Sequence, residues 1–333
     1  MSRLPLRGAA LVATALVVTS CGGTDASDDT GAEGGGSTSS SSGAFPVTVS
    51  TAFGDVEVPE EPTRVVALGW GDAEIALALG VQPVGASDWL GFGGEGVGPW
   101  AEGEYDEAPE IIETLEPSIE AIAALDPDLI LDTKSPATQE RYDALSDIAP
   151  TISQPEDTDP YVVSLDQQLD LIGQALAKTE EAEAIEDEID QAFADAAEAH
   201  PEFDGTEVAV AAYTSDGFGA YVRGDSRVDF MEQLGFTNAP AIQDLAGESF
   251  YVSVSEEQLP LLDADLTVAF PIFVEASEIT GNPLWQAIPS VQAGNAVVLD
   301  DETLTSAFSI GTPQGIQYAL DNAVPLFADA LAD

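Results

Sequence analysis

The sequence predicts an α/β protein with two lobes and a helical segment between them. Three observations lead to this prediction. Short apolar runs alternate with amphipathic helices in both halves of the chain, as in folds with parallel sheets. Residues 161–200 repeat apolar side chains at helical spacing only. A pattern of six residues also recurs at a single offset of 137 positions.

The first lobe opens with a strand–helix–strand unit. Residues 65–68 and 81–86 are short apolar runs, typical of buried parallel strands. Between them, Asp72 is placed to cap a helix over 73–79, and Gly80 is placed to end it. Connections this short are typical of α/β folds.

Four more elements complete the first lobe. Ser118 is placed to cap a helix that runs to Leu125. The Asp-Pro-Asp break at 126–128 ends that helix, and 129–131 is the next strand. A helix near 139–145 and a strand around 151–152 follow.

Residues 161–200 predict two helices, with Thr179 as a candidate cap between them. The apolar positions are Leu165, Leu169, Ile172 and Leu176 in the first helix, and Ile185, Ile189 and Phe193 in the second. The second helix, about 180–199, would be roughly 30 Å long at about 1.5 Å per residue. It would be long enough to cross a whole domain, or it is a surface helix of one domain.

The second lobe begins with an apolar strand over 207–213, and a loop is predicted for 214–224. Ser226–Asp229 resembles a capping box and opens a helix that runs to Leu234 and Gly235. Further strands are predicted at 266–270 and 296–299. Thr312-Pro313 predicts a cap and first-turn proline for a C-terminal helix.

The recurring pattern links the two lobes. Each copy predicts a cap, a helix, an acidic break and a strand. Ser118, Glu120, Leu125, Asp126, Asp128 and Leu129 reappear as Ser255, Glu257, Leu262, Asp263, Asp265 and Leu266. Coincidence is possible in a chain rich in Asp and Leu, but six matches at one offset favour duplication.

The N-terminal residues predict export and a lipid anchor. Arg3 and Arg7 precede an uncharged run over 9–18, which fits a signal peptide over 1–20 and is too short to span a bilayer. The run ends in Val-Thr-Ser-Cys-Gly, which resembles a bacterial lipobox with Cys21 as the lipidated (palmitate) residue. The alternative is an ordinary signal peptide with an incidental cysteine.

Residues 21–44 predict a flexible tether. Of the 23 residues from 22 to 44, 16 are Gly, Ser or Thr, too polar and too small to offset their ordering entropy. Such a tether has a root-mean-square span on the order of 25 Å. The expected organisation is therefore a first lobe over 45–160, a helical segment over 161–200 and a second lobe over 201–333.

Composition excludes several classes of function. With 61 acidic residues against 8 Lys and Arg, the net charge of −53 argues against nucleic-acid partners and anionic lipid headgroups. A single Cys excludes an intrachain disulfide, and a single His argues against His-ligated metal clusters and catalytic triads. A hydrophobic content of 44% argues against a disordered acidic chain.

Five segments in order resemble the iron–siderophore-binding proteins of ABC importers, the ferric siderophore family of class III periplasmic binding proteins. One matches their signature E-x-I-x-x-L-x-P-D-L-I. The segments are Arg64–Gly85, Ile119–Ile130 (the signature), Tyr142–Ile152, Phe230–Phe236 and Asn282–Ile288. The resemblance covers essentially all of 46–330.

The resemblance implies two Rossmann-like lobes joined by a single long interdomain helix, which 161–200 would supply. It also implies a non-enzymatic role in iron transport. A monomeric lipoprotein at the outer face of the cell membrane would capture a ferric siderophore between its lobes. It would then deliver this ligand to a permease driven by a cytoplasmic ATPase. No cofactor is implied, and no metal site on the protein, because the siderophore holds the iron.

A ligand cleft between such lobes is built from loops at strand ends. Trp70 follows the first strand, and Trp89 and Trp100 flank a Gly-rich loop over 91–98. Their aromatic faces suit a large, partly apolar chelate. The alternative for each is ordinary packing, which is the preferred interpretation for Trp285.

Scarce cations are the second group of candidates, because they can hold the oxygens of a chelate. The candidates, together with the nearby Tyr221, are Lys134, Arg141, Arg223 and Arg227. The alternative is a surface ion pair, easily made in so acidic a chain, and Arg64 is interpreted as structural.

Glu120 and Glu257 hold matching places in the repeated pattern, each in the first turn of a predicted helix. An acid there is favoured by the helix dipole alone. The resemblance implies a further role, since in similar proteins one acid on each lobe docks onto arginines of the permease.

Other functions have weaker support. Gly91–Gly96 matches G-x-G-x-x-G by letters, but no helix follows, so a phosphate site is not expected. Free zinc or manganese sites commonly use several His, and haem sites commonly use axial His or Tyr, whereas the lone His200 is interpreted as solvated. The alternative that stays open is the same scaffold binding cobalamin, haem or another metal chelate. The near absence of Lys is typical of a salt-tolerant surface.

Overall fold

A computed structural model describes residues 44–247 and 249–332 of the chain. The predicted signal peptide over 1–20, Cys21 and the tether up to residue 43 lie outside the described residues. Among the described helices, none combines the length and the apolar character that crossing a membrane would require.

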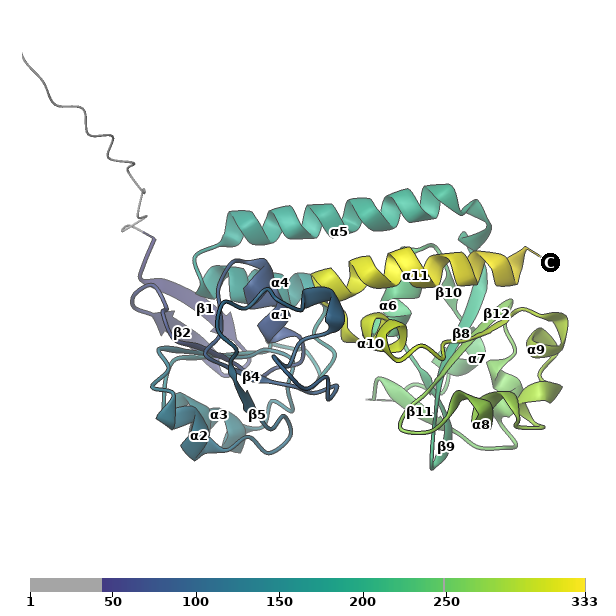
Figure 1. Ribbon diagram of the computed structural model, residues 1–333, viewed down its shortest axis with the longest axis horizontal. Helices are drawn as coiled ribbons and strands as arrows, with labels where there is room; N and C mark the ends of the chain where they lie inside the picture. Colours follow the sequence, from purple (N-terminus) through teal and green to yellow (C-terminus); the bar gives the residue numbers. More distant parts are fainter. Residues whose placement is uncertain (1–43, 248, 333) are drawn as a thin grey trace, which may run out of the picture. The chain divides into compact units, whose positions relative to one another are not determined.

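The first sheet has five strands, all parallel, in the order β5-β4-β3-β6-β7 (Figure 1). They are β3 (Val65–Ala67), β4 (Gly85–Ser87), β5 (Glu110–Ile112), β6 (Leu129–Asp132) and β7 (Thr151–Ser153). The chain builds outward from β3 on one side and then returns to add β6 on the other. The strand order therefore reverses between β3 and β6.

Helices cover both faces of this sheet (Figure 1). One face packs against α1 (Asp72–Ala78), α4 (Leu165–Ala175) and the hairpin of β1 (Val47–Thr51) and β2 (Gly54–Val58). The other face packs against α2 (Ile119–Ala124) and α3 (Gln139–Ser146) through Ile122 and Leu145. Burial on both faces explains why the central strands β3 and β6 read as apolar runs without alternation.

The second sheet is mixed, in the order β11-β9-β8-β12-β13, with β10 also parallel to β8. Here β8, β12 and β13 are parallel, whereas β9 is antiparallel to both β8 and β11. The strands are β8 (Glu207–Thr214), β9 (Gly217–Tyr221), β10 (Thr237–Asn238), β11 (Tyr251–Val254), β12 (Leu266–Pro271) and β13 (Ala296–Val298).

Several helices surround the second sheet. The α-helices are α6 (Ser226–Gln233), α7 (Pro240–Gln243), α8 (Ala276–Thr280), α9 (Pro289–Ala293), α10 (Glu302–Ile310) and α11 (Pro313–Leu331). The second lobe also has short 3₁₀ helices at Pro201–Phe203, Leu259–Leu262 and Trp285–Ala287, and the first lobe has one at Pro99–Ala101, between β4 and β5. As expected, Thr312 caps α11 with Pro313 in its first turn.

The long helix α5 (Thr179–Ala199) contributes side chains to the cores of both lobes. Ala182 is buried in the core of the first sheet, whereas Ile189 and Phe193 are buried in the core of the second. The helix has 21 residues, so it reaches both cores without a break. This arrangement favours the interpretation as a helix that joins the lobes over that of a surface helix of one domain.

Several local predictions were wrong. The loop expected over 214–224 contains β9, because Gly217 and Gly219 leave no apolar alternation to recognise. The strand expected over 81–86 is β4 at Gly85–Ser87. The helix expected after Ser255 is a turn and a 3₁₀ helix, since Pro260 cannot donate a helical hydrogen bond.

Three expected caps lie one residue inside their helices. Asp72, Thr179 and Ser226 are the first helical residues, and the cap positions belong to Gly71, Lys178 and Asp225. Only Asp225 among these three uses its side chain as a cap, accepting from the Arg227 N–H at 3.0 Å. Asp72 instead points its carboxylate at other partners, described below.

Candidate ligand-binding site

An aromatic cluster lies at the carboxyl ends of β3 and β4. The indole rings of Trp70 and Trp89 stack with centroids 4.2 Å apart and planes 6° apart. Tyr161, which follows β7, packs against Trp70 at 4.4 Å with a 35° tilt. The two tryptophans were predicted, and Tyr161 was missed.

The main chain around Trp70 is held from both sides. Its N–H donates to the Lys134 carbonyl at 2.9 Å, and its carbonyl accepts from Gln168 Nε2 at 3.1 Å. The preceding residue, Gly69, has no room for a Cβ, which would collide with the Asp72 carboxylate. A rigid backbone therefore presents the Trp70 ring at the strand end.

The buried Asp72 carboxylate organises the same turn. It accepts from the N–H groups of Gly69 and Thr133, each at 3.0 Å, from the Thr133 hydroxyl, and from Gln168 Nε2 at 3.0 Å. Burial raises the pKa of Asp72 to about 6, although these donors oppose the shift. The side chain therefore ties β3, β6 and α4 together beneath the aromatic cluster.

A second aspartate orients Trp89. The Asp88 carboxylate accepts from the Phe92 N–H at 2.9 Å and from the Gly93 N–H at 2.7 Å. These bonds turn the chain sharply after β4. The turn leaves the Trp89 ring against Trp70.

The indole N–H groups of Trp70 and Trp89 are both buried, and neither finds an acceptor among the described residues. A buried donor without a partner costs on the order of 1–3 kcal/mol.

Lys134 follows β6 and connects the two lobes. Its Nζ donates to the Ser226 hydroxyl at the start of α6 over 2.8 Å. Burial lowers the pKa of Lys134, while the carboxylates of Asp225 and Asp229 oppose that shift. Trp70 and Lys134 thus flank the point between β3 and β6 where the strand order reverses, the usual ligand position in open α/β sheets.

The loop of 222–225, between β9 and α6, also approaches the first lobe, at a point distinct from the contact of Lys134 with Ser226. A Cβ built on Gly224 would lie 3.8 Å from the Cβ of Val162, the residue after Tyr161. Gly224 has a φ of +92°, so a side chain there would also be strained. The loop that carries Arg223 is therefore close to the segment that carries Tyr161.

Each of the three predicted guanidinium groups has a carboxylate partner. Arg141 binds Asp132 with two hydrogen bonds of 2.9 and 2.7 Å, and both side chains are nearly buried. The exposed Arg223 pairs with Glu232 at 2.6 Å.

Arg227 forms the third pair, with Asp225 at 2.9 Å. Its guanidinium carbon lies 4.2 Å from the centre of the Tyr221 ring. Burial works against its charge, but Asp225 and Tyr221 raise the pKa of Arg227 above its ordinary value. Burial raises the pKa of Tyr221 to about 12, so its hydroxyl stays protonated.

Trp100 lies apart from the aromatic cluster. Its indole N–H donates to the Glu74 carboxylate at 2.9 Å, and its ring packs against Tyr318 of α11 at 5.7 Å. It lines a cavity of about 550 Å³ beside α5 and α11, separate from Trp70 and Trp89. The structure therefore does not bring Trp100 together with the other predicted aromatic residues.

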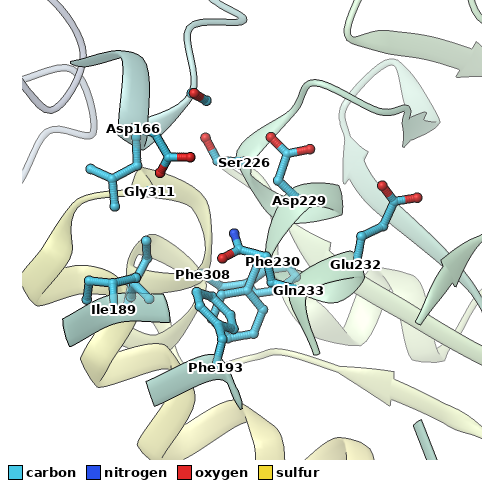
Figure 2. A pocket seen from close by; sticks show the side chains of 14 residues that line it. Asp166, Ile189, Phe193, Ser226, Asp229, Phe230, Glu232, Gln233, Phe308 and Gly311 are labelled. Carbon is cyan, nitrogen blue, oxygen red and sulfur yellow. The ribbon is translucent and has the colours of Figure 1, made fainter. Parts of the chain in front are cut away.

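A cavity of about 430 Å³ lies beside α6, next to the loop that carries Arg223 (Figure 2). The rings of Phe193, Phe230 and Phe308 lie together in its lining, which also contains the carboxylates of Asp166, Asp229 and Glu232. Ser226, the partner of Lys134, also lines it. Of the described residues that line this cavity, none is basic.

The remaining candidates lie elsewhere. Glu120, in the first turn of α2, and Glu257, in a turn before a 3₁₀ helix, are both exposed. Trp285 is only 2% exposed, as expected for packing. Arg64 donates to the Leu125 carbonyl at 2.7 Å, as expected for a structural residue. His200 pairs with Glu202 at 2.9 Å.

Tyr161 carried a signal that could have been used. It follows Pro160 in the segment between the strand around 151–152 and the helix of 165–175, so it lies after a strand end like Trp70 and Trp89. Its φ of +67° is uncommon for an aromatic residue and cannot be recognised in the sequence.

Comparison with known proteins agrees with this geometry. Residues 65–303 match the sequence profile of the periplasmic binding protein family. A probable siderophore-binding lipoprotein of Bacillus subtilis, YfiY, is 29% identical over 299 residues, which cover 84% of this chain and 87% of the relative.

Solved structures extend the likeness to the fold. PiaA of Streptococcus pneumoniae TIGR4 in complex with ferrichrome is 25% identical with a TM-score of 0.75, covering 86% of this chain and 98% of that one. A periplasmic solute-binding protein from Mycobacterium smegmatis is 28% identical with a TM-score of 0.75, covering 86% and 99%. The two α/β lobes joined by one long helix are the class III arrangement that the sequence predicted. The chain belongs to the periplasmic binding protein family, whose members are solute-binding proteins.

Proposed function

We propose that this protein is an extracytoplasmic solute-binding lipoprotein that captures a ferric siderophore and delivers it to an ABC importer. One observation carries the proposal. Trp70, Trp89 and Tyr161 gather at the reversal of strand order in the first lobe, where the second lobe approaches through Lys134 and Ser226. The relatives named for siderophore binding support the ligand class.

The chemistry of the cluster fits binding without reaction. Stacked aromatic rings offer a large apolar area and few rotamers to freeze, which suits a bulky metal chelate. The buried pairs of Arg141 with Asp132 and of Arg227 with Asp225 make the surrounding frame rigid. In this role the siderophore holds the iron, and the protein supplies only the surface that recognises it.

Delivery would use a lipid anchor and a docking surface. Cys21 would carry the acyl chains that hold a monomer at the outer face of the cell membrane, each buried CH₂ contributing about 0.8 kcal/mol. Glu120 and Glu257 would present one carboxylate per lobe to the permease, whose cytoplasmic ATPase drives import. Their exposure is compatible with this role.

Tryptophan fluorescence tests the ligand class directly. The mature protein, from residue 21 onward, is titrated with ferric hydroxamates, ferric catecholates, haemin and cobalamin. Strong saturable quenching by a ferric chelate supports the proposal, because two tryptophans lie in the site. Quenching by haemin or cobalamin alone would contradict the proposal and would identify that compound as the ligand class.

Two variants test which tryptophan lies in the ligand site. Trp70→Ala should weaken affinity by about tenfold or more, because it removes the ring at the centre of the cluster. Trp100→Phe tests the more distant candidate and should leave affinity within about twofold, since Trp100 packs against Tyr318 instead. If Trp100→Phe weakened affinity and Trp70→Ala did not, the ligand site would instead be assigned to the cavity beside α5 and α11.

A further inference from the structure

The charges around the site carry an inference about the ligand, which rests on the proposed function. Four cations were expected to hold the oxygens of a chelate: Lys134, Arg141, Arg223 and Arg227. Each faces carboxylates of the protein itself. Arg141 binds Asp132, Arg223 binds Glu232, and Arg227 binds Asp225.

Lys134 is no exception. Its amino group is buried and donates to Ser226, and the carboxylates of Asp225 and Asp229 oppose the lowering of the Lys134 pKa by burial. These four cations therefore face as many carboxylates: Asp132, Asp225, Asp229 and Glu232. Asp72 and Asp88 add negative charge beside the aromatic cluster.

The cavity of about 430 Å³ beside α6 is also lined by negatively charged side chains. Asp166, Asp229 and Glu232 line it, and none of its described lining residues is basic (Figure 2). An anionic ligand near α6 would be repelled by these carboxylates, and the repulsion is stronger where the local dielectric constant is below that of water.

We propose that the ligand is a ferric chelate without net negative charge, the class to which ferric trihydroxamates belong. Three hydroxamates balance Fe³⁺, and an appended ammonium group makes the complex cationic. Ferric tris-catecholates and ferric citrates keep negative charge. The stacked aromatic faces of Trp70 and Trp89 attract a cationic chelate and pack against a neutral one.

A matched series of probes isolates charge from shape. Ferrioxamine B is a linear ferric trihydroxamate with an ammonium tail; acetylation of the tail makes it neutral, and succinylation makes it anionic. The iron centre is the same in all three. We expect the cationic and neutral forms to bind at least about tenfold more tightly than the anionic form in low salt.

Other outcomes are distinguishable. Equal or tighter binding of the succinylated form would overturn the charge inference. Tightest binding of a ferric tris-catecholate or ferric citrate would overturn it too, while the proposed function would stand. Failure of every ferric chelate to bind, with haemin or cobalamin binding instead, would overturn the proposed function itself.

A variant tests whether the protein's own carboxylates set this preference. Glu232→Gln releases the exposed Arg223 and should improve affinity for the succinylated probe several-fold, with little gain for the cationic probe. Glu207→Gln, an exposed residue at the start of β8, removes the same charge away from this loop and is the matched control. Equal effects of the two variants would show that the pairing of Arg223 does not govern selectivity.

Discussion

Asp128 and Asp265, 137 positions apart, occupy equivalent places in the two lobes. The Asp128 carboxylate accepts from the N–H groups of Thr63 and Arg64 at 2.8 and 2.9 Å, just before β3. The Asp265 carboxylate accepts from the N–H of Glu207 at 3.0 Å, the first residue of β8. The next residues, Leu129 and Leu266, pair in register with those first parallel strands. This equivalence supports the duplication predicted from the repeated pattern.

The first prediction concerns this pair of aspartates. Asp128→Ala should lower the free energy of unfolding by about 1–2 kcal/mol, because the carboxylate accepts from two N–H groups and the Thr63 hydroxyl. Asp265→Ala should cost less, about 0.5–1 kcal/mol, because one bond is lost. Urea denaturation measures both, with exposed Asp300→Ala as control. A larger loss in the free energy of unfolding for Asp265→Ala than for Asp128→Ala would contradict this prediction.

A second prediction concerns the buried contact between α1 and α11. The Thr312 hydroxyl caps α11 and also donates to the buried Glu74 carboxylate. Thr312→Val should therefore lower the free energy of unfolding by about 1–3 kcal/mol, through a lost cap and a lost donor to Glu74. Thr312→Ser keeps the hydroxyl and should recover most of the loss in the same urea experiment. If Ser were as harmful as Val, packing of the methyl group would be the cause.

Buried carboxyl groups predict that mild acid stabilises the protein. Burial raises the pKa of Asp72 and of Asp229 to about 6, against 3.8 for an ordinary Asp. The folded chain thus holds protons that the unfolded chain has released, so stability falls as pH rises from about 4 through 6. Between pH 7 and pH 5, Asp72 alone should add about 1 kcal/mol to the free energy of unfolding.

Urea denaturation at pH 7, 6 and 5 measures this dependence. Asp72→Asn should flatten the curve, whereas Asp55→Asn in the exposed hairpin should leave its slope unchanged. A steady loss of stability from pH 7 to pH 5 would contradict the prediction.

The net charge predicts a dependence on salt. With a charge of −53, mutual repulsion opposes the compact state, and dissolved ions screen it. The Tm should therefore rise by several degrees between low and molar NaCl. Sucrose at matched osmolality is the control for effects unrelated to screening. An unchanged Tm across the NaCl series would show that repulsion contributes little to stability.

Permease docking gives the last prediction. Glu120→Lys combined with Glu257→Lys should abolish ferric siderophore uptake by cells and leave affinity in the purified protein unchanged. Glu183→Lys with Glu198→Lys, two exposed acids of α5, makes the same change in charge and should leave uptake intact. Loss of affinity in the first double variant would refute a docking role.

Much of the fold could be predicted because its signals are local. Ser118 and Thr312 cap their helices through their own side chains, and the strand at 129–131 reads as an apolar run. The long helix over 180–199 followed from spacing alone. Misplaced caps such as Asp72 arose because a short acidic side chain suits either the cap or the first turn.

The site was only partly predictable, since its members come together through distant contacts. Trp70 and Trp89 were chosen as candidates because both follow strands, and the structure brings these two rings together; Trp100 could not be separated from them by sequence. Nothing local indicated that Arg141 would bind Asp132 or that Lys134 would reach Ser226.

The amino-acid sequence by itself determined the central parallel strands, the long helices, the acidic character and the scarcity of cations, because each depends on neighbours in the chain or on composition. Tertiary structure alone decided which aromatic rings share a surface and whether a cation stays available to a ligand. The physical reason is that charge pairing and burial depend on which strand ends become neighbours. A guanidinium is free or neutralised according to side chains that folding brings from elsewhere.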